Sequence, residues 1–285
     1  MNKDFNEIFN KSLNRAIGGG ISGSSAMVLQ IGSLMWLRTT MNYQYRYGDN
    51  IFKTVKFLYK DGGIPRFYKG LGPALIQGPL SRFGDTASNA GVITFLDSYE
   101  ESKNLPTSIK TFCSSCIAGL WRINLMPIDT VKTIMQVEGK DSINILKDKY
   151  KQNGIRTFYQ GSIASSSATI IGHYPWFYTY NLLSEMIPEK ETTIENLKRN
   201  ALIGFSSSLV SDITSNSLRV IKTTKQSHSN NMNYNDTIKI IINNDGIRGL
   251  FLRGLETRII TNGLQSILFT IAFKNFMKKW EEINN

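Results

Sequence analysis

Three copies of one short pattern, spaced about ninety residues apart, constrain this chain more than any other feature of its sequence. GGIPRFYKG ends at Gly70, NGIRTFYQG ends at Gly161 and DGIRGLFLRG ends at Gly254. Intervals of about 91 and 93 residues are longer than the repeats of soluble solenoids, which run from about 20 to 50 residues. The sequence therefore predicts a single domain over 1–285 made of three similar units. We place these units at about 10–100, 105–190 and 195–282.

Each unit contains the same predicted helices in the same order, which makes the chain an all-α protein with six long helices. A long helix rich in small residues opens the unit, a short amphipathic helix follows, and a second long helix returns after the glycine pattern. The opening helices are expected at about 14–41, 108–137 and 197–226. The short helices are expected at about 51–60, 142–151 and 234–243. The returning helices are expected at about 72–98, 162–187 and 256–281.

Two of the long helices contain uncharged runs of the length that crosses a bilayer. No formal charge occurs in 16–37 or in 160–184, and a membrane helix needs about 20 residues. The other four carry polar or charged residues, which inside a membrane face protein or a wet cavity. The connections within units are strongly basic and those between units are mildly acidic. This asymmetry predicts a spanning bundle with both termini on the side opposite the basic connections.

A second motif lies near the end of each opening helix. In the second unit it reads MPIDTVKTIMQ, with Pro127, Asp129, Lys132 and Gln136. The third unit reads NSLRVIKTTKQ, where Ser217, Arg219, Lys222 and Gln226 hold the same places. The first unit reads QIGSLMWLRTT, and we align Ile31 with the proline, Ser33 with the acid and Trp36 with the base, followed by Arg38 as a second base. Together with the aromatic and glycine pattern, these motifs resemble the mitochondrial carrier family over nearly the whole chain.

The resemblance implies three pseudo-symmetric helix pairs around a central cavity that opens alternately to the two sides of the mitochondrial inner membrane. The short helices would face the matrix and both termini the intermembrane space. The proline kink and the charges would form a matrix gate in which the acid of one repeat meets the base of the next. The implied gate pairs are Ser33 with Lys132, Asp129 with Lys222, and Arg219 with Trp36 as a cation–aromatic contact. Gln136 and Gln226 would brace this gate.

The resemblance also implies positions for substrate and lipid. Substrate contacts would lie about two turns into the returning helices, at Gln77, Ala168, Thr169, Thr261 and Asn262. Ionisable residues in expected spans are added as functional candidates, namely Arg82, Asp85, Arg122, His173 and Asp212. Two alternatives stay open, an internal pair of Arg82 with Asp85 and a packed, non-titrating His173. Cardiolipin is implied at Gly70, Gly161 and Gly254, which are otherwise ordinary turn glycines.

The mixed charges at these positions favour a small carboxylate or a zwitterion over a large nucleotide as the transported metabolite. The family's cytosolic pattern, aromatic-acid-x-x-base, is incomplete at Tyr180 and at Phe273, and the first unit offers no clear match. Exchange, uniport, proton coupling and the direction of transport remain open. The protein is expected to be a monomer without cofactors.

Other function classes fit less well. Cys113 and Cys116 form a lone C-x-x-C without further ligands, so no metal site is expected. An enzyme is disfavoured because nucleotide-binding loops and paired metal motifs are absent from the sequence. Lysine and arginine total 33 against 22 acids, but this charge is spread over three connections and does not form a compact nucleic-acid-reading surface. The remaining alternatives are a carrier of another organelle membrane, such as the peroxisome, or a non-transporting helical scaffold.

Overall fold

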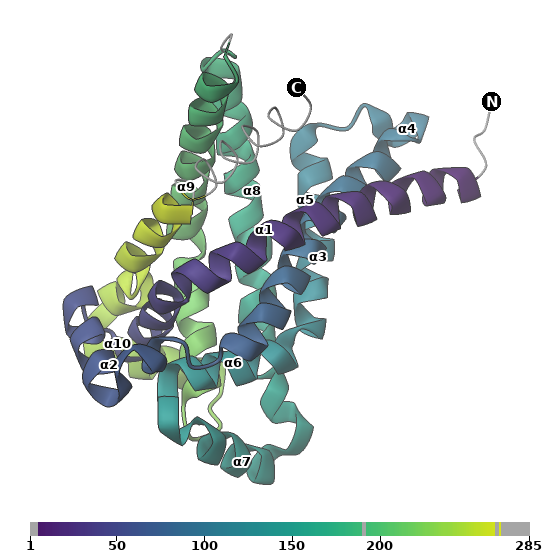
Figure 1. Ribbon diagram of the computed structural model, residues 1–285. Coiled ribbons are helices and arrows are strands. Elements are labelled where there is room, and N and C mark those ends of the chain that lie inside the picture. The colour runs from purple at the N-terminus through teal and green to yellow at the C-terminus, as the bar shows by residue number, and fades with distance from the viewer. Residues whose placement is uncertain (1–4, 190–191, 266–267, 269–285) are drawn as a thin grey trace, which may run out of the picture.

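The computed structural model describes residues 5–189, 192–265 and 268, and within these residues every regular element is a helix (Figure 1). The all-helical prediction is confirmed. Each opening and returning segment is helical over its expected range as far as the structure describes it, although α1 begins nine residues before the expected residue 14 and the second opening segment is divided into two helices. Their bounds are α1 Phe5–Tyr47, α3 Leu71–Asp97, α5 Thr107–Asn124, α6 Met126–Glu138, α8 Ser162–Met186, α9 Thr193–Ser227 and a final helix over 255–265. The remainder of the expected 256–281 helix lies outside the described residues.

Three shorter helices follow the opening helices: α2 Ile51–Phe67, α7 Ser142–Asn153 and α10 Tyr234–Leu252. Figure 1 shows them together at one end of the molecule, while α4 (Glu100–Lys103) and the start of α9 lie at the opposite end. Asparagine side chains cap two of these helices: Asn50 accepts from the Lys53 amide and Asn233 from the Asp236 amide. In the described part of the chain, no helix combines the length and the apolar character of a conventional membrane span.

Two of the opening segments are interrupted at the same relative place. Leu125 separates α5 from α6, two residues before Pro127 in the first turn of α6. A proline there removes a backbone donor and crowds the preceding turn, which explains the break. In α1, Leu34 leaves the helical region (φ −116°, ψ 15°) without a proline nearby. The break in α1 is therefore held by packing of the surrounding helices.

Three glycines join each unit to the opening helix of the next. Gly70, Gly161 and Gly254 all have positive φ, at 82°, 80° and 65°, which L-residues with a side chain adopt only at a cost. A β-carbon at Gly70 would lie 3.1 Å from the Lys132 carbonyl oxygen, and one at Gly161 would lie 3.2 Å from that of Lys222. A β-carbon at Gly254 would lie 3.2 Å from the Met41 carbonyl oxygen. The backbone conformation and the close approach together account for glycine at these positions.

Three basic side chains, one from each unit, also contact the opening helix of the next unit. Their acceptors are carbonyls four residues beyond those that the glycines approach. Arg66 donates from Nη1 to the carbonyl of Gln136 at 2.8 Å, and Lys149 donates from Nζ to that of Gln226 at 2.8 Å. Arg253 donates from Nη1 to the Tyr45 carbonyl at 3.5 Å and to the Arg46 carbonyl at 3.1 Å. Carbonyls at a helix C-terminus lack intrahelical partners and carry partial negative charge. Each unit thus caps the opening helix of the next, and the third unit caps that of the first.

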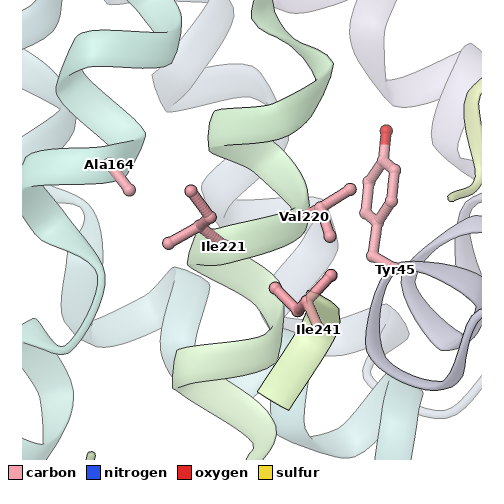
Figure 2. Close-up of a cluster of buried hydrophobic side chains, with 5 residues drawn as sticks. All are labelled: Tyr45, Ala164, Val220, Ile221 and Ile241. Carbon is pink, nitrogen blue, oxygen red and sulfur yellow. The ribbon is translucent and has the colours of Figure 1, made fainter. Parts of the chain in front are cut away.

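A cluster of buried apolar side chains lies beside this ring (Figure 2). Tyr45 of α1, Ala164 of α8 and Ile241 of α10 surround Val220 and Ile221 on α9. All five are less than a tenth exposed. Because these side chains come from all three units, their burial stabilises the units against one another.

Candidate functional site

Asp129 lies at the centre of a charged cluster near the middle of the molecule. Its Oδ1 accepts from Lys132 Nζ at 2.6 Å, and its Oδ2 forms an ion pair with Lys222 of α9. Gln226 donates to Asp129 Oδ2 at 3.3 Å and to Thr130 Oγ1 at 3.0 Å. Asp129 is only 4% exposed, so two cations and an amide satisfy a carboxylate that burial alone would destabilise.

The two glutamines of the repeated motif lie at equivalent places but bind different partners. Gln136 accepts from Asn42 Nδ2 at 2.6 Å and donates to the sulfur of Met35. Gln226 binds the carboxylate directly, as described above. Lys132 also donates to Gln77 Oε1 at 3.0 Å, which joins one expected substrate contact to the Asp129 cluster.

The glycine and cation contacts described above, which we call the cyclic contacts, show which residues of α1 correspond to the repeated motif of α6 and α9. This correspondence differs from the alignment made on sequence. The glycine contacts align Met41 with Lys132 and Lys222, and the cation contacts align Tyr45 with Gln136 and Gln226. The breaks agree with this shift. Leu34 precedes Trp36 as Leu125 precedes Pro127. Trp36 therefore aligns with the proline and Arg38 with the acid, five residues beyond Ile31 and Ser33.

The sequence analysis placed the first motif too early because no proline, acid or glutamine marks it. The structure brings neither Ser33 to Lys132 nor Trp36 to Arg219. Ser33 is exposed and Trp36 is 37% exposed. Arg219 donates from Nε to Ser215 Oγ at 3.2 Å. Cation–aromatic contacts within the described ranges are Arg46 with Tyr47 and Lys225 with Tyr234.

A second charged pair joins α3 to α5. Arg122 donates from Nη2 to Asp85 Oδ2 at 2.6 Å, with side chains 24% and 13% exposed. Asp85 therefore pairs across helices and not with Arg82 on its own helix. His173 of α8 interacts electrostatically with both members of the pair and packs its ring edge-on to Phe177. These residues, three of the candidates named from sequence, bring α3, α5 and α8 to one region.

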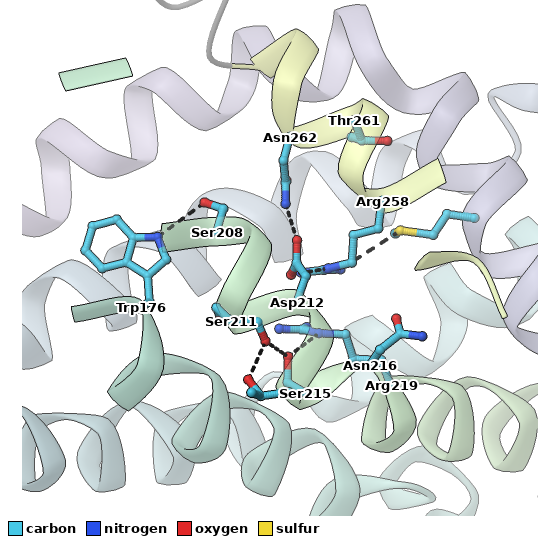
Figure 3. Close-up of polar contacts among 12 residues, drawn as sticks. Trp176, Ser208, Ser211, Asp212, Ser215, Asn216, Arg219, Arg258, Thr261 and Asn262 are labelled. Carbon is cyan, nitrogen blue, oxygen red and sulfur yellow. Dashed lines mark hydrogen bonds and ion pairs between the residues drawn. The ribbon is translucent and has the colours of Figure 1, made fainter. Parts of the chain in front are cut away.

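A third charged group joins α9 to the helix over 255–265 (Figure 3). Asp212 forms an ion pair with Arg258 Nε and accepts a hydrogen bond from Asn262 Nδ2. Arg219 interacts electrostatically with Asp212, while its Nε donates to Ser215 Oγ (Figure 3). Asp212 and Asn262 were expected from sequence, whereas Arg258 was missed. Its position four residues after Gly254, on the helix face shared with Asn262, could have revealed it.

The remaining expected contacts hold no charge partner. Thr169 donates to the Ser165 carbonyl at 3.2 Å and Thr261 to the Thr257 carbonyl at 2.6 Å, each within its own helix. Ala168 is 2% exposed. These three side chains are therefore packed, and any role of the two threonines in binding would require their hydroxyls to exchange partners.

Cations outnumber acids in the three charged groups. Asp129, Asp85 and Asp212 account for every central ion pair that the described residues form. Arg38 and Arg219 form no ion pair within these same residues. Arg38 has only the sulfur of Met27 at 4.0 Å, and its buried Nε has no acceptor. The cations of these groups that are not exposed are Arg38, Arg122, Lys132, Arg219, Lys222 and Arg258, whereas Arg82, also expected from sequence, is exposed.

One pattern at the opposite end was missed by the sequence analysis. Residues 99–103 read Tyr-Glu-Glu-Ser-Lys and fit the aromatic-acid-x-x-base spacing. They form the short helix α4 and not the end of α3, and Lys103 Nζ lies 3.9 Å from Glu100 Oε1 on the exposed surface. The counterparts at Phe273, Lys274 and Lys278 lie outside the described residues.

No group of metal-ligating side chains assembles in the part of the chain that the structure describes. Cys113 and Cys116 are free thiols on α5. The arrangement is therefore one of charged and polar side chains from every long helix around a common centre.

The sequence pattern of the family described as mitochondrial carrier protein matches residues 104–191 and 195–283. The chain belongs to the mitochondrial carrier family. Members of this family are transporters and not enzymes, and they imply that the carrier is located in the mitochondrial inner membrane.

Individual relatives are distant. The carrier is 26% identical over 230 residues to a calcium-binding mitochondrial carrier of Saccharomyces cerevisiae, covering 70% of this chain and 41% of that protein. It is 24% identical over 275 residues to mitochondrial thiamine pyrophosphate carrier 1 of Coccidioides immitis, covering 90% of this chain and 85% of the relative. It is 24% identical over 302 aligned positions to a mitochondrial glycine transporter of Yarrowia lipolytica, covering 96% and 97%.

Proposed function

We propose that this carrier moves a small anionic metabolite across the mitochondrial inner membrane by alternating access. In this proposal, three repeats at about 10–100, 105–190 and 195–282 each supply two membrane helices and one matrix helix. The observation that carries it is the surplus of cations over acids between the long helices. Ionisable side chains inside a membrane protein face the interior or a water-filled path and mark the route of an ion or substrate.

The charge surplus favours an anion over a zwitterion. A zwitterion brings no net charge and leaves Arg38 and Arg219 without a counter-ion, whereas an anion compensates them. The sequence analysis disfavoured large phosphates because few bases lay at the expected contacts. Arg258, Arg38 and Arg219 supply bases that it did not count there. The relatives named for thiamine pyrophosphate and for glycine differ in charge, so the names alone do not select a substrate.

The proposed matrix gate follows the register that the cyclic contacts support. Its positions pair Asp129 with Lys222, Arg38 with Lys132, and Arg219 with Met41. The Asp129 to Lys222 ion pair is the one acid–base pair in this set. Gln226 braces it through two hydrogen bonds.

We further propose that the carrier works as a monomer with both termini in the intermembrane space. Cardiolipin would bind beside Gly70, Gly161 and Gly254, where the free amides of following helices favour a phosphate. The basic residues of α2 and α7 support this placement because these two helices lie together at one end of the molecule. Mass spectrometry of the purified carrier with its lipids would detect bound cardiolipin.

The function is tested in liposomes containing the purified full-length carrier. A thermal-shift screen against anionic metabolites selects a candidate, since a ligand that binds the folded state stabilises it. Uptake of that candidate is then measured for the wild type and for the double variant Asp85→Asn with Arg122→Gln. We expect the double variant to lose uptake by at least tenfold and to remain folded, because both members of the buried pair are neutralised together.

The matched control is Arg248→Gln on α10, which removes one positive charge from an exposed position. This variant should transport at the wild-type rate. Wild-type uptake by the Asp85→Asn, Arg122→Gln variant would exclude these residues from the route. Selective uptake of neutral or cationic solutes would exclude the anionic substrate class.

A further inference from the structure

Two arginines occupy the gate positions where the second unit has its acid. Arg38 and Arg219 align with Asp129 in the cyclic contacts that relate the three units. Asp129 binds two lysines, but neither arginine has a carboxylate in contact among residues 5–189 and 192–265. The gate region therefore lacks two negative charges relative to a set of three acid–base pairs.

Arg258 brings these two arginines into one electrostatic group. It interacts electrostatically with Arg38 and with Arg219. The acid within this group, Asp212, already accepts from Arg258 Nε and Asn262 Nδ2. Figure 3 shows the Arg258 guanidinium beside the Asp212 carboxylate, and the Arg219 guanidinium next to Ser215 on the same helix. Among these three arginines, Arg258 forms the ion pair with Asp212, and Arg219 and Arg38 form none in the described residues.

The hydrogen-bond donors of this group are also short of acceptors. Arg38 Nε is buried without a partner, and Arg38 Nη2 contacts the sulfur of Met27 at 4.0 Å. Arg258 is bound by Asp212 and interacts with Tyr45, and its Nη1 contacts the sulfur of Met41 at 4.0 Å. Thioether sulfur is a weak acceptor, and a buried guanidinium without an acceptor or counter-ion is costly. A bound anion that is not part of the chain would supply both the missing hydrogen-bond acceptor and the missing counter-ion.

We propose that a phosphate group binds between Arg38, Arg219 and Arg258 and serves as the missing acid of the closed matrix gate. Guanidinium groups bind phosphate through paired hydrogen bonds. The three arginines come from α1, α9 and the 255–265 helix. A tetrahedral phosphate presents oxygens in three directions, whereas the two oxygens of a carboxylate lie in one plane. This inference rests on the proposed transport function and narrows its substrate to a phosphate-bearing anion.

The site is tested by direct binding, independently of transport. Thermal unfolding of the detergent-solubilised full-length carrier is followed in low salt with orthophosphate, pyrophosphate, succinate or chloride. We expect orthophosphate and pyrophosphate to raise the melting temperature at concentrations where chloride and succinate do not. Arg38→Gln and Arg219→Gln should each weaken the binding of pyrophosphate by at least tenfold. Arg248→Gln, the exposed control, should leave it unchanged.

Charge-conserving variants keep the test decisive if a glutamine variant fails to fold. Arg38→Lys and Arg219→Lys retain the charge but lose the planar fork, and they should also weaken pyrophosphate binding. Wild-type binding by both lysine variants would overturn the proposal. Equal stabilisation by succinate, with the same sensitivity to these substitutions, would overturn the phosphate assignment in favour of a dicarboxylate.

Two further measurements identify the source of the phosphate and separate this inference from the transport proposal. If a nucleoside diphosphate binds more tightly than pyrophosphate, the group belongs to an organic substrate, and if it does not, the anion is inorganic. Intact phosphate binding without uptake of any phosphate compound would contradict the transport proposal and leave the site standing. Uptake of a non-phosphorylated anion, unaffected by Arg219→Gln, would overturn the site and leave transport standing.

Discussion

At the scale of single residues, the first unit keeps the backbone positions of the repeated motif, although the residue types at these positions differ from those of the second unit. Trp36, Arg38, Met41 and Tyr45 hold the places that proline, acid, base and glutamine hold in the second unit. None of these four residues is of the type that marks the motif in the second unit. The close approach of Gly254 and the cap from Arg253 nevertheless preserve the backbone geometry.

Restoring an ion pair at the aligned positions tests this register. Met41→Lys alone places a cation beside Arg258 and should destabilise the carrier, as should Arg219→Asp alone by leaving an unpaired acid near Asp212. The double variant should recover about 1 to 3 kcal/mol of coupling, the range for residues in contact. The measurement is a double-mutant cycle on thermal stability in detergent.

The competing register supplies the matched control. Trp36→Lys combined with Arg219→Asp should show additive effects within about 0.5 kcal/mol, because the structure holds these side chains apart. Strong coupling between positions 36 and 219, with none between positions 41 and 219, would show that the alignment made on sequence is the correct one and would contradict the register proposed for the gate.

At the scale of the helices, the C-terminus of α9 depends on one buried lysine. Lys149 of α7 is fully buried and donates to the carbonyls of Gln226 and His228, each at 2.8 Å. Burial, with smaller contributions from Lys225 and Arg46, lowers the pKa of Lys149 to about 8 from its usual 10.5. The hydrogen bonds to carbonyls remain available to the neutral amine.

This pKa predicts how stability changes with pH. Between about pH 8 and 10.5 the unfolded lysine holds its proton while the folded one has released it, so the unfolded state binds more protons and stability rises with pH. Thermal unfolding between pH 7 and pH 10 should therefore show a steeper rise for the wild type than for Lys149→Met. Lys147→Met, at an exposed position on α7, should keep the wild-type slope. Identical slopes in all three proteins would show that Lys149 stays charged.

At the scale of the whole molecule, periodicity predicted the helices well, and local sequence predicted the site less well. The recurring glycine pattern located both long helices of each unit because it repeats at regular intervals. Asp129 with Lys222, and Asp212 with Asn262, could be found from the motif and from the cost of charge in a membrane. Arg258 and the register of α1 could not, because they depend on which backbone Gly254 approaches, a contact more than 200 residues apart in sequence.

The cyclic arrangement makes a long-range prediction. Arg253→Met should loosen the end of α1, so amide hydrogen exchange should increase at residues 45–50, while amides at 136–141 should exchange as in the wild type. Arg66→Met should have the opposite pattern, since Arg66 caps the end of α6. Exchange that increases equally at both places in either variant would indicate a general loss of stability in place of a local one.

The hydrogen bonds from Arg253 to the carbonyl end of α1 can form only late in the synthesis of the chain. Arg253 follows Tyr45 by 208 residues, so the first long helix to leave the ribosome is the last to have its carbonyl end closed. Until nearly the whole chain is made, those carbonyls bind water or an assisting protein. Chains truncated before residue 253 should therefore remain with such assisting proteins, because a ring of three units is closed only by its final member.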